Sequence, residues 1–181
     1  MELRTPRLLL REYTPDDWEA VHRYASLPEV MRFITYRPNT EDDTRDFIRR
    51  VVDLAAEDPR EKWEMAVVDA DAGGVLIGGC GYWWTDRETQ EAEIGYLFHP
   101  DVWRNGYATE VAQALIAFGF TQLGAHRITA RCNADNPASA RVMEKCGMQR
   151  EAHFRRRLWG HGRWWDEFVY AILDEGWKRS A

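Results

Sequence analysis

The chain has 181 residues, of which 45% are hydrophobic and 30% charged, and its formal net charge is −6. This is the composition of a folded globular domain, and the length suits one domain with a sizeable core. No apolar run approaches the roughly 20 residues of a membrane span, and the first residues lack the apolar core of an export signal. We therefore expect a cytoplasmic protein with no membrane partner, and the acidic total argues against a nucleic-acid partner.

The cysteines and histidines are scattered along the chain. Cys80, Cys132 and Cys146 are odd in number and lack the spacing of metal ligands, which is typical of reduced thiols. The five histidines show no such spacing either. We expect no metal site.

The charge is divided unevenly between two parts of the sequence. Residues 1–100 carry 12 Lys and Arg against 21 Asp and Glu, whereas residues 101–181 carry 12 against 9. A polyanionic cofactor bound by the second part and a cationic substrate steered to the first would fit this division. An ordinary scatter of solvated charges would produce it equally well.

The first part of the chain predicts two helices followed by a hairpin. Thr14 and Thr40 both precede acidic residues and suit the N-cap position of a helix. The expected elements are a strand at 7–13, a helix from 14 to 27, an irregular piece at 30–36, a helix from 40 with Phe47, Val51 and Leu54 on its inner face, and strands at 63–69 and 75–84. Gly78, Gly79 and Gly81 in the last strand indicate either a bulge or a close backbone approach.

The central stretch runs from Ala92 to Thr109 and predicts a strand, a loop and a helix. Aromatic and branched residues alternate with others until Pro100, which cannot continue a ladder. The helix begins near Gly106, with an apolar stripe at i, i+4 and i+7. The first amides of such a helix lack intrahelical acceptors and attract anions, so a phosphate or pyrophosphate site is one interpretation and a simple turn is the other.

The remaining segments complete one mixed domain. We expect a strand at 127–132, a helix at 137–145 ended by Gly147, and strands at 148–154 and 164–173 joined by a basic, aromatic loop. The fold class is therefore α/β (α+β): a single domain over residues 1–181, with a mixed, mostly antiparallel sheet and helices on both faces.

Three segments together resemble the GNAT superfamily of N-acetyltransferases, and more narrowly its ribosomal-protein (RimJ/RimL) branch. They are Ala-Glu-Ile-Gly-Tyr-Leu from Ala92, Gly-Tyr-Ala-Thr-Glu from Gly106, and Asn-Ala-Asp-Asn-Pro-Ala-Ser-Ala-Arg-Val-Met-Glu-Lys-Cys-Gly-Met from Asn133. The resemblance extends over nearly all of the chain. It departs at Trp103, where the superfamily loop begins with Gln or Arg.

The resemblance implies a site for acetyl-coenzyme A as cosubstrate. Backbone groups of the central strand would pair with the pantetheine arm, an amide near Leu97 would meet the oxyanion, and the loop amides would hold the pyrophosphate. The cofactor-binding residues expected on this basis are Tyr96, Leu97, Phe98, Arg104, Asn105, Gly106, Tyr107, Ala108, Thr109, Asn136 and Ser139. The side chain of Arg104 would add charge at the rim or simply be solvated.

Two side chains are candidates for the chemistry itself. Glu93 could draw a proton from the acceptor amine through water, or it could be a polar residue paired with an arginine. Glu91, nearer the strand edge, is a weaker candidate. Ser139 could protonate the leaving thiolate, and Asn136 could bind the pantetheine amides, although both also suit a helix N-terminus.

The aromatic residues offer a possible acceptor cleft. Trp83, Trp84, Trp159, Trp164 and Trp165 could line it or could simply pack in the core. His99 follows a strand in a His-Pro pair, which is more typical of a structural residue than of a catalytic one.

The expected function is that of an acetyl-CoA-dependent N-acetyltransferase, an acyltransferase of EC class 2.3.1. It would act by direct attack in a ternary complex, with the α-amine of a peptide or protein N-terminus as the favoured acceptor. Alternatives are an acetyltransferase for a small-molecule amine (antibiotic, polyamine or amino acid) and a non-catalytic coenzyme A-binding module. A phosphate-loop hydrolase is disfavoured because no Gly-Lys-Ser/Thr follows the glycine loop. The expected assembly is a monomer or homodimer.

Overall fold

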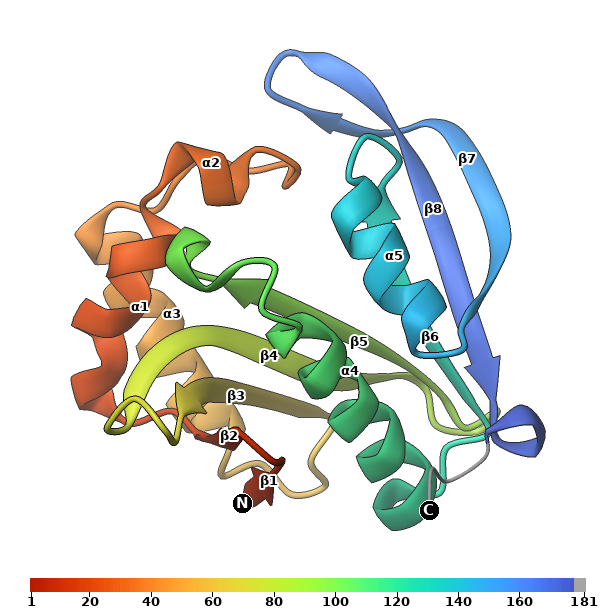
Figure 1. Ribbon diagram of the computed structural model, residues 1–181, viewed down its shortest axis with the longest axis horizontal. Helices are drawn as coiled ribbons and strands as arrows, with labels where there is room; N and C mark the ends of the chain where they lie inside the picture. Colours follow the sequence, from red (N-terminus) through yellow and green to blue (C-terminus); the bar gives the residue numbers. More distant parts are fainter. Residues whose placement is uncertain (178–181) are drawn as a thin grey trace.

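The computed structural model describes residues 1–177, which form one eight-stranded sheet covered by helices (Figure 1). The strand order is β1-β2-β3-β4-β5-β6-β8-β7. The strands are β1 (Glu2–Arg4), β2 (Leu8–Glu12), β3 (Lys62–Asp69), β4 (Val75–Asp86), β5 (Glu91–Phe98), β6 (Arg127–Asn133), β7 (Gln149–Gly160) and β8 (Arg163–Leu173). All neighbouring pairs are antiparallel except β5 and β6, so the expected fold class is confirmed.

The parallel pair in the middle of the sheet opens into a wedge. β5 and β6 are paired only where Glu91–Glu93 lie beside residues 127–129. Beyond this point the two strands diverge, and Figure 1 shows β6 and the β7–β8 hairpin leaning away from β5. The stretch of β5 from 94 to 98 is therefore left without a ladder partner on its β6 side, although β4 pairs with its other side.

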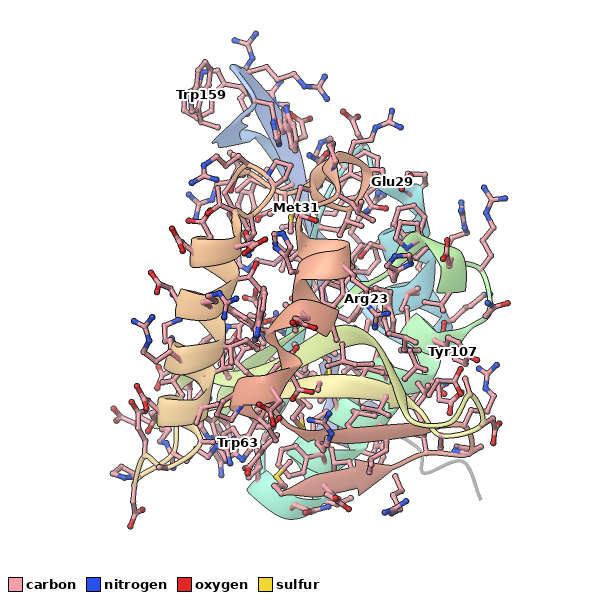
Figure 2. All side chains as sticks on the ribbon, turned by 90° about the vertical axis from the view of Figure 1, so that its left-hand side faces the viewer. Arg23, Glu29, Met31, Trp63, Tyr107 and Trp159 are labelled. Atoms are coloured by element: carbon pink, nitrogen blue, oxygen red, sulfur yellow. The ribbon has the colours of Figure 1, made fainter. Side chains whose placement is uncertain are left out.

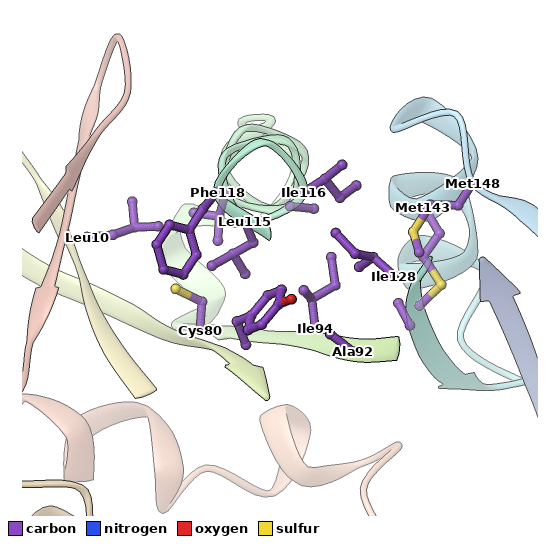
Figure 3. Packing of buried hydrophobic residues seen from close by; sticks show 14 of the residues in the cluster. Leu10, Cys80, Ala92, Ile94, Leu115, Ile116, Phe118, Ile128, Met143 and Met148 are labelled. Carbon is purple, nitrogen blue, oxygen red and sulfur yellow. The ribbon is translucent and has the colours of Figure 1, made fainter. Parts of the chain in front are cut away.

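The helices lie in two groups on opposite faces of the sheet. One face carries α1 (Trp18–Ala25), α2 (Pro28–Met31) and α3 (Glu41–Leu54), and the other carries α4 (Tyr107–Phe118) and α5 (Pro137–Lys145). Figure 3 shows the larger core beneath α4, where Leu115 and Phe118 pack against side chains from β2, β4, β5 and β6. Short 3₁₀ turns at Pro15–Asp17, Pro100–Val102 and Asp174–Gly176 and a π-helical turn at Gly119–Leu123 complete the described elements.

Local sequence signals set the helix ends as expected. The Thr40 side chain accepts a hydrogen bond from the Asp43 amide, and the Asp43 carboxylate accepts one from the Thr40 amide, which is a complete capping box. Gly106 and Gly147 adopt positive φ at the start of α4 and the end of α5. These assignments depend on neighbouring residues only, and for that reason the sequence predicts them well.

Long-range packing changes several other expectations. β1 was not expected, because three residues are too few to show a period. The inner face of α3 consists of Thr44, Ile48 and Val51, while Phe47 is only partly buried and meets Tyr13 edge to face. α2 replaces the start of the irregular piece expected at 30–36.

The largest difference is the β7–β8 hairpin. β7 continues past Phe154 to Gly160, across an irregularity, where a loop was expected. The extra residues include exposed arginines and form a two-stranded ribbon. With both faces largely exposed, the ribbon has no buried face to impose an apolar alternation on the sequence.

The glycines of β4 mark both a bulge and close backbone approaches, the two interpretations that the sequence allowed. A register shift lies opposite the first of them, between Val67 and Val68 of β3. A Cβ on Gly78 would collide with the Leu97 carbonyl, and one on Gly79 would collide with the Tyr13 hydroxyl. A bulge and close approaches are therefore both present. Within residues 1–177, every helix is too short or too polar to cross a membrane.

Candidate active site

The N-terminus of α4 forms an anion-binding loop beside the wedge. Gly106 is its N-cap with φ 83°, and Arg104 also has positive φ (65°). The amides of Tyr107, Ala108 and Thr109 belong to the first helical turn and have no acceptor within the helix. A Cβ on Gly106 would have the Arg7 guanidinium as its nearest neighbour, at 3.5 Å, so the space above this backbone position is open. The geometry suits a pyrophosphate, as the sequence predicts.

Arg7 holds this loop in place, and sequence reasoning did not single it out. Its guanidinium forms an ion pair with Glu110 of α4 (2.7 Å), donates to the Asn105 carbonyl (3.0 Å) and stacks on the Tyr107 ring. Thr5 also donates to Glu110. Burial alone would raise the pKa of Glu110, but the hydrogen bonds from Thr5 and Arg7 lower it. The first turn of α4 is thus fixed to the β1–β2 connection.

The free edge of β5 presents backbone groups of alternate residues. The His99 amide donates to the Ile77 carbonyl of β4, and successive residues of a strand direct their groups to opposite edges. Leu97 therefore faces β4, whereas Tyr96 and Phe98 face the wedge. An oxyanion at this edge would meet an amide next to Leu97 rather than that of Leu97 itself.

Trp103 departs from the superfamily pattern and has a contact of its own. Its indole nitrogen donates to the Phe98 carbonyl (2.9 Å), which joins the loop to the end of β5. His99 has a structural role, as expected, because its ring nitrogen accepts from the Asp101 amide at the next turn. The side chain of Arg104 is exposed and has no polar contact within residues 1–177.

Two hydroxyl groups meet across the wedge. The Tyr96 hydroxyl of β5 lies 3.2 Å from the Ser139 hydroxyl at the first turn of α5. Burial raises the pKa of Tyr96 well above its ordinary value, so both groups carry their protons at neutral pH. The Asn136 side chain accepts from the Ser139 amide, which confirms the capping interpretation of Asn136. Either hydroxyl is placed to donate to a group bound in the wedge.

The glutamates of β5 are both paired with arginines of β6. Glu93 accepts from Arg131 at 2.8 Å, and Arg131 also lies 3.5 Å from the buried Glu167 of β8. Glu91 pairs with Arg127 at 3.2 Å. The geometry therefore matches the ion-pair alternative for Glu93, and its carboxylate lies where β5 and β6 are still joined.

A third carboxylate on the same face of the sheet was missed by sequence reasoning. Glu64 of β3 faces Gly81 of β4, which in turn pairs with Gly95 of β5. Burial raises the pKa of Glu64 to about 7. The only sequence signal is a charged residue inside the otherwise apolar segment Trp-Glu-Met-Ala-Val-Val.

The β7–β8 turn and the segment after α2 meet at the outer end of the wedge, whereas Trp83 and Trp84 pair with Glu93 and Ala92 at its joined end. The β7–β8 turn contacts the segment after α2, because His161 bonds to the Ile34 carbonyl (2.8 Å) and Gly160 packs on Thr35. The tryptophans differ in environment: Trp165 is buried, Trp83 and Trp84 are half-buried, and Trp159 and Trp164 are exposed and stack on each other. Figure 2 shows Trp159 at the far tip of the hairpin. No cluster of possible metal ligands occurs among residues 1–177.

Close relatives match the chain over its whole length. An uncharacterized N-acetyltransferase, YnaD, of Bacillus subtilis is 39% identical over 178 residues, which cover 98% of this chain and 100% of that protein. The crystal structure of a GNAT-family acetyltransferase from Bacillus anthracis is 38% identical and superposes with a TM-score of 0.85, covering 97% of this chain and 99% of that one.

More distant structures share the fold and contain coenzyme A. A Vibrio cholerae spermidine N-acetyltransferase in complex with CoA and spermine is 21% identical (TM-score 0.81; 94% of this chain and 97% of that one). RimL, a ribosomal L7/L12 alpha-N-protein acetyltransferase in complex with CoA, is 16% identical (TM-score 0.83; 96% and 98%). Acetyl-CoA as the cosubstrate is consistent with these coenzyme A complexes of the same fold. The family model for the acetyltransferase (GNAT) domain matches residues 7–149, and the chain belongs to this family of N-acetyltransferases.

Proposed function

We propose that the protein acetylates the α-amine of a peptide or protein N-terminus, in the manner of the RimJ/RimL branch. The chain, residues 1–181, would act as one cytoplasmic domain, as a monomer or homodimer. The observation that supports a catalytic role is the hydroxyl pair of Tyr96 and Ser139 beside the unpaired edge of β5. A module that only bound coenzyme A would have no need of two proton donors at this point.

Each part of the wedge has a separate task in this proposal. The first-turn amides of α4 bind the pyrophosphate, and the outward backbone groups of Tyr96 and the Phe98 amide align the pantetheine arm, while the Phe98 carbonyl bonds to Trp103. When bound, acetyl-CoA supplies the thioester. Ser139 or Tyr96 donates the proton that the sulfur needs as the C–S bond breaks and the C–N bond to the amine forms. No residue forms a covalent bond to the acetyl group, so both substrates are bound together.

The preference for an α-amine follows from the cost of deprotonation. A lysine amine has an ordinary pKa near 10.4 and an α-amine about 8, so freeing the lysine at neutral pH costs about 3 kcal/mol more. The two glutamates of β5 are held by arginines, and neither is placed as a strong base. An amine of low pKa is the easier acceptor for such a site.

A small-molecule amine is the second candidate acceptor. One structural neighbour is a spermidine N-acetyltransferase and another acetylates a ribosomal protein, so the same fold serves both classes. The loops at 30–39 and 158–165 that contact each other at the wedge would select between them.

A panel of amines tests the proposal. Thiol release should be followed with acetyl-CoA and a lysine-containing peptide with a free N-terminus, spermidine, an aminoglycoside and free amino acids. Mass spectrometry of the peptide product then locates the acetyl group. Acetylation at the N-terminus supports the proposal, whereas predominant acetylation of lysine or of a small amine contradicts it. Coenzyme A binding by calorimetry without turnover of any amine would indicate a binding module.

A further inference from the structure

Glu64 is a carboxylate without a partner on the face of the sheet opposite α4. Its side chain is half-buried, yet within residues 1–177 it has no hydrogen bond and no ion pair. This distinguishes it from Glu91 and Glu93, which bind arginines. Keeping a carboxylate partly out of water without a partner is costly, and a strongly perturbed group of this kind is typical of a functional site.

The strand residues beneath the Glu64 carboxylate are glycines, which leave room for the side chains that lie over them. Gly81 and Gly95 lie side by side on β4 and β5, and a Cβ on Gly81 would come within 2.9 Å of a Glu64 carboxylate oxygen. The carboxylate thus extends over β4 toward the free edge of β5. Adjacent strands are about 4.8 Å apart, so only one strand spacing separates it from that edge.

An aromatic ring stands beside the same glycines. The indole of Trp83 would lie 3.1 Å from a Cβ on Gly81 and 3.0 Å from one on Gly95. Glu64 and Trp83 therefore flank one point above Gly81. A carboxylate beside an aromatic ring is a favourable site for an ammonium group, through charge on one side and cation–π attraction on the other.

We propose that Glu64 and Trp83 bind the ammonium group of the acceptor and that Glu64 accepts its proton. This inference rests on the proposed acetyltransferase function. One proton passes from the ammonium nitrogen to the Glu64 carboxylate, and the neutral amine then faces the β5 edge from the side opposite α4. The other proton that the amine loses on C–N bond formation is matched by the one that the hydroxyl pair gives to the thiolate.

The charged and titratable groups around Glu64 come from every element packed against it. Arg50 of α3 and Lys62 of β3 are the nearby cations, and both act to lower its pKa, against the larger effect of burial. The neutral groups close enough to be affected by its charge are Tyr13, Tyr24 of α1 and Cys80 of β4, for each of which burial raises the pKa, and the more exposed Tyr36. Glu64 is therefore the group in this cluster whose protonation changes near neutral pH.

The test compares Glu64→Gln with wild type and with a control, Glu57→Gln, which alters an exposed glutamate just beyond α3. Kinetics use acetyl-CoA with the fastest amine of the panel, between pH 5.5 and 9. For Glu64→Gln we expect kcat/KM for the amine to fall about 10²-fold and the acidic limb near pH 7 to disappear. The Kd for coenzyme A should stay within twofold. An unchanged kcat/KM and pH profile would overturn the proposal.

Calorimetry supplies a readout that does not depend on turnover. An alanine tripeptide with a free N-terminus is titrated into the coenzyme A complex of each variant at pH 7.5. Binding that is lost in Glu64→Gln and retained in Glu57→Gln supports the ammonium site even if wild type acetylates no amine, in which case the proposed function alone fails. Equal binding by both variants, or none by wild type, contradicts the ammonium site. Trp83→Leu should weaken the same binding about tenfold, and no change there would exclude the aromatic contribution.

Discussion

The two sides of the free β5 edge are built from different chemical groups. On the α4 side the site consists mainly of backbone: amides at a helix N-terminus and the outward groups of alternate strand residues. On the α1–α3 side it consists of side chains above a glycine floor, with Glu64 and Trp83 at its centre. A backbone site suits a ligand that never changes, because conformation alone defines it. A side-chain site can be altered by single substitutions, which suits an acceptor that differs between relatives.

This contrast predicts the largest effect for a change of backbone conformation at Gly106. Gly106→Val places a branched residue at φ 83° and fills the space above the first-turn amides. We expect coenzyme A affinity, measured by calorimetry, to fall at least 10²-fold, or about 3 kcal/mol. The matched control is Gly73→Val, which has a similar φ (73°) and no neighbour within 4 Å. If coenzyme A affinity falls equally in both variants, or in neither, the loop is not part of the cofactor site.

On the acceptor side, the corresponding prediction concerns how the stability of the fold depends on pH. Burial raises the folded-state pKa of Glu64 from 4.5 to about 7. An acid with a raised pKa destabilises the fold once it ionises, so the wild type loses stability as the pH rises from about 4.5 to 7. Glu64→Gln should therefore be more stable than wild type at pH 8, by up to about 3 kcal/mol, and equal to it at pH 4.

Urea unfolding at the two pH values measures this difference. A function-stability trade-off of this sign is typical of a charge kept for binding. Glu57→Gln should show no pH-dependent gain, since its carboxylate is exposed. A Glu64→Gln protein that is less stable than wild type at pH 8 would show that the carboxylate has a structural partner.

The sequence predicts the α4 side of the site much better than the acceptor side. The α4 loop is local: Pro100, Gly106 and the helix stripe lie within about twenty residues of sequence, so their pattern can be read directly. Arg7 supports the same loop from about 100 residues away, and only the tertiary contact reveals its role.

The acceptor side depends on strand register, which the sequence does not specify alone. Glu64, Gly81 and Gly95 come from three strands and become neighbours only when β3, β4 and β5 pair in the observed register. Glu93 is a candidate base in the sequence because it lies within the segment that carries the family motif. Its Arg131 partner, however, comes from β6, 38 residues further along. Neither the strand register nor the Glu93–Arg131 ion pair can be predicted from local sequence patterns.

The hydroxyl pair lies between the two sides and should give an intermediate effect. Tyr96→Phe and Ser139→Ala each remove one of two neighbouring donors, 3.2 Å apart. We expect each to lower kcat about tenfold, or roughly 1.4 kcal/mol, because the remaining hydroxyl can still donate. The double variant should lose more than the product of the two single effects. A simple product, measured in the same thiol-release assay, would mean that only one hydroxyl serves the reaction or that they act separately.

The smallest effect is expected for Glu93→Gln, and it decides between the two glutamates on the acceptor face. Glu93 is paired with Arg131, whose side chain is 39% exposed, and such partly solvated pairs contribute about 0.5–1 kcal/mol. Glutamine keeps the hydrogen-bonding shape, so the loss of stability should be of this size and kcat should fall less than about threefold. Glu91→Gln is the matched control, since it breaks the equivalent pair with Arg127. If Glu93→Gln alone lowers kcat about 10²-fold while coenzyme A affinity and stability stay unchanged, the proton acceptor is at the joined end of the wedge. The glycine floor would then have no catalytic role.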